Sequence, residues 1–337
     1  MSLQILKNEL KADIVRNIYL LYGYEDYLEN YYLKRIINKA DIKNEDFNVI
    51  FQDGKDLTPQ NISDTLEVCP LFSEKKIYII TNLPSTNQDA LLYLKENLSE
   101  VPEHTILIIS LEEETLVNYK DVFKELAKVN GLVVEFEKSK EPALCDWVLR
   151  QLKSRDHYAD NKTIRYMLSI CDNKMSSLIN EIDKLSNYCI NPEITYREID
   201  TVITKTLDAK VFLLTNAILN GEYDKSFTIL NSLLKQNFDE INIASSIYNA
   251  FIKLYLVKAS IKSRVPKSTV MKDLTMKEYP YKLNAVLANK TDEIFIGGCI
   301  KLCLEADLLL KQYYIDKKFI IYKLIGDIFL LERKKNA

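Results

Sequence analysis

The sequence predicts an α/β domain followed by all-helical structure. In the first 138 residues, five short apolar runs alternate with amphipathic stretches of helical length. Strands that alternate with helices in this way form a mostly parallel sheet covered by helices. After the segment EKSKEP the strand pattern stops, and apolar residues recur only at helical spacing.

The predicted strands are short apolar runs of the length expected for buried strands. They lie at residues 18–22, 48–51, 76–81, 105–110 and 132–136. Helices at residues 143–152, 161–170 and 175–188, followed by the segment ITYREIDTVI, predict a small helical domain over 139–209. For the remainder, residues 210–337, the spacing of apolar residues predicts long helices. Its predicted breaks are Gly221, Pro266, Pro280 and the pair Gly297 and Gly298.

The composition is that of an ordinary globular protein, but its charge is uneven. The 337 residues are 47% hydrophobic and 28% charged, with a formal net charge of −3. Residues 210–337 hold 20 Lys and Arg against 13 Asp and Glu, whereas the preceding part is acidic. This asymmetry indicates a polyanionic partner for the basic part, or else a lysine-rich solvated surface.

Cysteine spacing and hydropathy indicate neither metal nor membrane binding. The six cysteines form no CxxC pair and only two histidines accompany them, so we expect most of the cysteines to be small buried apolar residues. Cys299 and Cys303 lie four residues apart on a predicted helix, but without a second pair of ligands we expect no metal site. The first residues lack a secretory signal pattern, and no run of about 18 apolar residues occurs. We therefore expect a cytoplasmic protein.

Residues 18–36, IYLLYGYEDYLENYYLKRI, have the strand–turn–helix pattern at which a nucleotide-binding domain carries its phosphate loop. Such a loop needs several glycines, a lysine for the phosphates and a Ser or Thr for magnesium. Here Gly23 is followed by Tyr24, Glu25 and Asp26, and the acidic pair would repel phosphate. We therefore predict a degenerate phosphate loop and no nucleotide cofactor.

Other catalytic patterns are weak. The acidic residues 112–114 follow a strand, as a magnesium-binding carboxylate would, but without a phosphate-loop lysine they are better interpreted as a solvated loop. No nucleophile elbow or activated cysteine occurs. Tyrosines alternate with lysines in residues 310–323, where Tyr313, Phe319 and Tyr322 are predicted as helix core residues, with base stacking as the alternative.

The segment LTPQNISDTLEVCPLFSEKK is the strongest candidate binding element. Thr58 caps a helix that Pro70 ends, and Ile62, Leu66 and Cys69 are expected on its inward face. Next come Leu71 and Phe72. At the surface, this pair would gain roughly 1.5–3 kcal/mol for each side chain on burial in a partner; alternatively, the pair covers the domain's own core.

Six segments, in order along the chain, resemble the delta-subunit family of the bacterial DNA polymerase III clamp loader. They are YLLYGYEDYL, FNVIFQDGKDL, CPLFSEKKIYIITNL, WVLRQLK, NEIDKLSNY and IT…EID…VI. The resemblance covers most of the chain and is best in the first 210 residues. In the last part it depends on length and on the segment EADLLLK.

The resemblance implies three domains: an AAA+-like domain over 1–138 that does not hydrolyse ATP, a helical lid over 139–209 and a helical collar over 210–337 through which subunits assemble. It implies that Leu71 and Phe72, with Cys69 beside them, contact the sliding clamp (the beta subunit). The other implied partners are delta-prime and gamma/tau type ATPase subunits, and primed DNA within the loader.

The chain is thus expected to be a non-catalytic subunit of a DNA-directed DNA polymerase holoenzyme, without a cofactor. ATP on sister subunits would control its clamp-binding surface. The alternatives are an active nucleotide-dependent enzyme, which the missing lysine disfavours, and a helical nucleic-acid-binding or scaffolding protein with a degenerate ATPase domain.

Overall fold

The computed structural model describes residues 2–111, 119–312 and 316–336. The chain divides into two compact units. Unit 1 consists of residues 1–140 with 174–176, and unit 2 of residues 141–173 with 177–337. Both predicted helical domains lie mainly in unit 2, so the boundary between them at residue 209 stays a prediction.

Unit 1 is built on a five-stranded sheet in the order β2-β3-β4-β1-β5, with every neighbouring pair parallel. The strands are β1 (Ile18–Gly23), β2 (Val49–Asp53), β3 (Lys76–Leu83), β4 (Thr105–Leu111) and β5 (Leu132–Phe136). The predicted parallel α/β architecture is confirmed. Burial on both faces explains why most of these strands read as continuous apolar runs.

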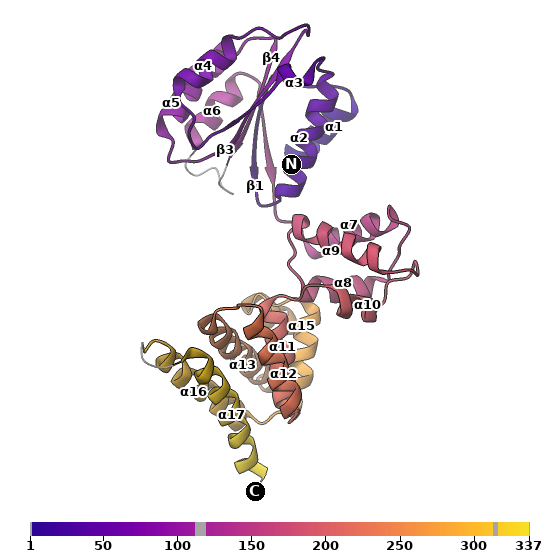
Figure 1. Ribbon diagram of the computed structural model, residues 1–337, viewed down its shortest axis with the longest axis vertical. Helices are drawn as coiled ribbons and strands as arrows, with labels where there is room; N and C mark the ends of the chain where they lie inside the picture. The colour runs from indigo at the N-terminus through magenta and orange to yellow at the C-terminus, as the bar shows by residue number, and fades with distance from the viewer. Residues whose placement is uncertain (1, 112–118, 313–315, 337) are drawn as a thin grey trace. The chain divides into compact units, whose positions relative to one another are not determined.

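Helices cover both faces of this sheet (Figure 1). One face packs against α1 (Ser2–Lys11) and α2 (Asp26–Ala40). The other packs against α4 (Pro59–Glu67), α5 (Gln88–Asn97) and α6 (Lys120–Lys128). A short helix, α3 (Glu45–Asn48), leads directly into the edge strand β2, and a 3₁₀ turn, η1 (Leu98–Glu100), follows α5.

The chain after residue 140 is helical in nearly all of its described elements, as predicted. The helices are α7 (Glu141–Lys153), α8 (Asn161–Ile170), α9 (Met175–Tyr188), α10 (Tyr196–Val202), α11 (Leu207–Leu219), α12 (Tyr223–Lys235), α13 (Glu240–Lys262), α14 (Lys267–Asp273), α15 (Glu278–Lys290), α16 (Glu293–Leu310) and α17 (Lys317–Asn336). Among the described residues, none of the helices has the length and apolarity needed to cross a membrane.

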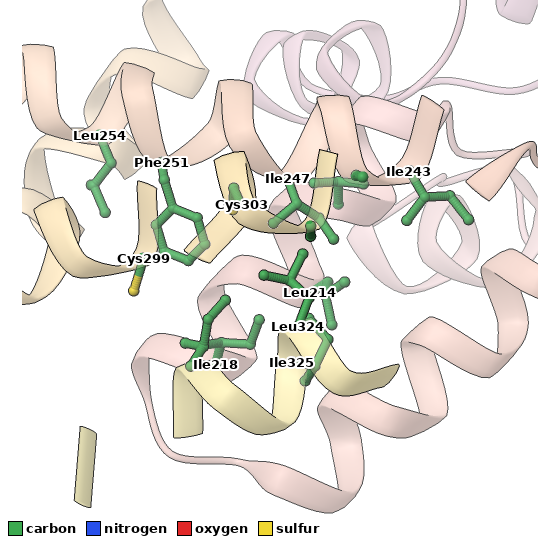
Figure 2. Packing of buried hydrophobic residues seen from close by; sticks show 14 of the residues in the cluster. Leu214, Ile218, Ile243, Ile247, Phe251, Leu254, Cys299, Cys303, Leu324 and Ile325 are labelled. Atoms are coloured by element: carbon green, nitrogen blue, oxygen red, sulfur yellow. The ribbon is translucent and has the colours of Figure 1, made fainter. Parts of the chain in front are cut away.

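The core of unit 2 lies between α11, α13, α16 and α17, whose apolar side chains point toward one another (Figure 2). Phe251 on α13 and Ile325 on α17 are fully buried in it. Cys299 and Cys303 belong to the same cluster, as expected for apolar cysteines. Burial raises the pKa of the Cys303 thiol to about 12, so it stays protonated at neutral pH.

Two predictions for unit 2 are wrong. Gly297 and Gly298 do not break a helix but lie inside α16. At Gly298 the lack of a side chain leaves room for α17, since a Cβ there would lie 2.5 Å from a methyl group of Leu331. Phe319, predicted in the core, is 61% exposed, whereas Tyr322 packs against the core cluster. Tyr313 lies outside the described residues.

Candidate functional site

The loop between α4 and β3, residues 68–75, presents apolar side chains to solvent. Phe72 is 83% exposed, Val68 57% and Leu71 46%, and Cys69 is exposed as well. The sequence left open whether Leu71 and Phe72 cover the core of their own domain. In the structure both are surface residues of unit 1, and a cluster of exposed apolar side chains is a candidate for an interaction site.

The end of α4 places these residues outside. Thr58 caps the helix through the backbone N–H of Asn61, and Ile62 and Leu66 pack into the core, as predicted. The prediction that Cys69 faces inward is wrong, because α4 ends at Glu67. The residue before a proline is disfavoured in helical geometry, so the chain preceding Pro70 leaves the helix and turns Cys69 outward.

Lys76 holds the last turn of α4 in place. Its Nζ donates to the carbonyl oxygens of Thr65 at 2.6 Å and Leu66 at 3.1 Å, and also to that of Val68. These bonds supply partners for carbonyls that a helix C-terminus leaves unpaired. Lys76 is only 1% exposed, and burial lowers the pKa of its ammonium group.

Asn48 holds the backbone of Leu71. The Leu71 N–H donates to Asn48 Oδ1 at 2.7 Å, and Asn48 Nδ2 donates to the Leu71 carbonyl oxygen at 2.8 Å. Nδ2 also donates to the carbonyl oxygen of Lys43 at 2.7 Å, and the Asn48 residue is buried. Sequence reasoning assigned no functional role to Asn48 or Lys76, because their partners are distant in sequence or are backbone atoms.

Phe72 itself has an unusual backbone conformation. Its φ is +52°, in the left-handed region that non-glycine residues rarely occupy. For a residue with a Cβ this conformation costs roughly 1–2 kcal/mol. Asn48 and Lys76 hydrogen-bond to Leu71 and Val68 and so hold the loop in this shape. The strained backbone of Phe72 is therefore maintained, and its aromatic ring stays exposed.

The predicted degenerate phosphate loop lies where β1 leads into α2. Gly23 has a φ of +134°, and a Cβ there would lie 2.6 Å from the carbonyl oxygen of Phe136. That oxygen accepts hydrogen bonds from the N–H groups of Tyr24, at 2.9 Å, and Glu25, at 3.1 Å. The amides of a phosphate loop point at the ligand, whereas these two are already bonded to the neighbouring strand.

Acidic side chains occupy the same turn. Glu25 is fully buried, and its Oε1 accepts a hydrogen bond from the Ser139 N–H at 3.1 Å. Asp26 opens α2, and Glu29, one turn further, has its pKa raised by burial while it accepts a bond from Ser110. A helix N-terminus usually attracts anions, but here the chain's own carboxylates supply the negative charge.

In the described part of the chain, no group of three or more His, Cys, Asp or Glu side chains converges as metal ligands would. The acidic residues 112–114, considered as a magnesium-binding position, lie outside the described residues.

Besides the loop at residues 68–75, the outer face of α16 also exposes large apolar side chains. Ile294 is 85% exposed, Leu308 65% and Leu304 49%. With Gly297 and Lys301, which are also exposed, they recur at alternating spacings of three and four residues. This is the spacing with which one helix packs along another.

Comparisons with known proteins agree on one family. The family described as DNA polymerase III, delta subunit matches residues 19–137, and the C-terminal domain of the same subunit matches residues 208–328. The chain is 24% identical to DNA polymerase III subunit delta of Bacillus subtilis, over 97% of this chain and 95% of that protein. It is 22% identical to a probable DNA polymerase III subunit delta of Aquifex aeolicus, over 72% and 70%.

A solved structure has the same fold. The Bacillus subtilis DNA clamp loader delta protein superposes with a TM-score of 0.56 at 21% identity, over 98% of this chain and 100% of that one. The similarity therefore extends over both units.

Proposed function

Because this chain belongs to the DNA polymerase III delta-subunit family, and so is a clamp-loader component, we propose that it binds the sliding clamp and stabilises its open form in the cytoplasm during replication. One observation carries the proposal: Leu71 and Phe72 are exposed on a loop whose backbone is held by buried polar side chains. Cys69 and Val68 lie beside them as smaller contacts.

The loop has the properties of a preorganised anchor. Burying a Leu or Phe side chain is worth roughly 1.5–3 kcal/mol, provided that the loop need not be ordered on binding. A bound protein opens a ring only by its higher affinity for the open form. In this mechanism Leu71 and Phe72 supply affinity, and the rigid surface around them fits the open clamp better than the closed one.

The chain itself would neither bind nor hydrolyse ATP. The amides of Tyr24 and Glu25 are bonded to Phe136, and no lysine occupies the turn. The energy for the cycle would come from delta-prime and gamma/tau type subunits, whose ATP state exposes or hides the α4–β3 loop. We propose that residues 210–337, acting as a collar, assemble with those subunits, and that primed DNA is met only within the complete loader.

The test is binding of the full-length chain to the purified sliding clamp, measured by calorimetry with and without ATP. We expect a saturable complex that does not depend on ATP, and no ATP binding tighter than a dissociation constant of about 10 μM, roughly −7 kcal/mol. Absence of a clamp complex would refute the proposal. Binding to DNA alone, with no affinity for the clamp, would favour a nucleic-acid-binding protein.

A further inference from the structure

Asn48 ends α3 and immediately precedes the edge strand β2, yet its side chain acts on a loop 23 positions later in the sequence. One carboxamide satisfies both the N–H and the C=O of Leu71, as a neighbouring strand would do. It also holds the carbonyl of Lys43, so the α4–β3 loop is tied to the segment that leads into α3. Only 1% of Asn48 is exposed, which shields these bonds from water.

The loop is therefore held at two points ahead of Phe72, at Val68 and at Leu71. Lys76 fixes the carbonyl of Val68 at the end of α4, and Asn48 fixes Leu71. Between and after these points no regular secondary structure occurs before β3 begins at Lys76. Phe72, the next residue, remains left-handed and exposed. The two polar side chains thus replace the backbone bonds that the loop itself lacks.

We propose that Asn48 is a positioning residue for clamp binding: it holds Leu71 and Phe72 in their binding conformation before the clamp arrives. This inference depends on the proposed function. Asn48 contacts no partner itself, since it is buried; it acts through the backbone of Leu71. Without the Asn48 side chain, Leu71 and Phe72 become more mobile in the free chain. Part of the binding free energy is then lost to ordering them when the clamp binds.

The first test compares two alanine variants of the full-length chain. Asn48→Ala should bind the clamp about tenfold more weakly, which corresponds to about 1.4 kcal/mol. Asn87→Ala is the matched control, because Asn87 also bridges loops in unit 1, donating to the carbonyls of Gly54 and Leu57 at 2.9 Å each. Asn87→Ala should leave clamp affinity unchanged. Equal affinities for both variants and the wild type would overturn the inference.

The second test separates positioning from general destabilisation. In a Phe72→Ala background, the further change Asn48→Ala should weaken binding by clearly less than in the wild-type background, because part of what Asn48 positions is gone. A merely structural role predicts the same fold-loss in both backgrounds. Equal losses would therefore contradict positioning.

A third measurement needs no variant. Amide hydrogen exchange of the free wild-type chain should show the Leu71 N–H protected, although its side chain is exposed. Exchange at the rate of an unstructured loop would overturn the inference even if Asn48→Ala fails to fold. A wild-type chain that does not bind the clamp would refute the proposed function; a binding wild type with an unprotected Leu71 would refute only the role of Asn48.

Discussion

The backbone of Gly23 lies against Phe136 so closely that a Cβ on Gly23 would be 2.6 Å from the Phe136 carbonyl oxygen. The same oxygen accepts the N–H groups of Tyr24 and Glu25. The single glycine of this turn therefore serves the approach of two strands. The glycine is thus needed for packing β1 against β5, although the turn has none of the groups that a phosphate loop uses to hold phosphate.

Gly23→Ala should destabilise unit 1 by about 2–5 kcal/mol, since a left-handed φ and a backbone clash add together. Thermal unfolding of the full-length chain would show it. Gly326→Ala is the control: a Cβ there meets nothing within 4 Å inside α17, so a gain of about 0.5–1 kcal/mol is expected. Similar unfolding curves for both variants would contradict the packing described.

Replacing Leu71 and Phe72 together by alanine should weaken clamp binding by roughly a thousandfold, at about 2 kcal/mol for each anchor. Because both side chains are exposed, the melting temperature should stay within about one degree or two of the wild type. The matched control changes Ile5 and Leu92, which are 41% and 52% exposed elsewhere on unit 1, and should keep full affinity. Unchanged affinity in the Leu71 and Phe72 variant would remove the site assignment.

Lys76→Met should destabilise unit 1 by about 1–3 kcal/mol at pH 7, because three carbonyls lose their donor. Burial lowers the pKa of Lys76 below its ordinary value of 10.5 in the folded chain. Between these two pKa values the unfolded chain binds more protons, so this residue adds stability as the pH rises.

The advantage of the wild type over Lys76→Met should therefore grow as the pH increases from neutrality toward 10.5. Urea unfolding of both proteins at a series of pH values measures this difference in the free energy of unfolding. Parallel stability curves would show that Lys76 titrates as it does in the unfolded chain.

If the collar assembles through the exposed face of α16, Ile294→Glu with Leu308→Glu should reduce assembly with the other clamp-loader subunits by a factor on the order of a hundred, because assembly would then bury two charges. Size-exclusion chromatography of the reconstituted loader would report it. Ile190→Glu, at a residue that is fully exposed outside α16, is the control and should assemble normally. Normal assembly of the α16 variant would exclude this face from the collar interface.

Much of the fold was predictable because burial leaves a local signature. Strands buried on both faces read as apolar runs, so β1, β3 and β4 appeared close to their observed bounds. The residues at which α8 and α9 begin and end were also predicted. The exposure of Leu71 and Phe72 was not predictable, since the same apolar pair suits a core or a surface. The end of α4 at Glu67 and the bonds from Asn48 and Lys76 to the following loop decided it.

By itself, the sequence determined the parallel α/β domain, the helical remainder, the absence of a phosphate-loop lysine and the family resemblance, because these depend on residue type and local spacing. The tertiary structure alone decided that Gly298 of α16 packs on Leu331 of α17 and that Asn48 bonds to Leu71. These last relationships join residues that are far apart along the chain. A hydrogen bond or a close contact depends on distance in space, and folding sets that distance only when the whole unit packs.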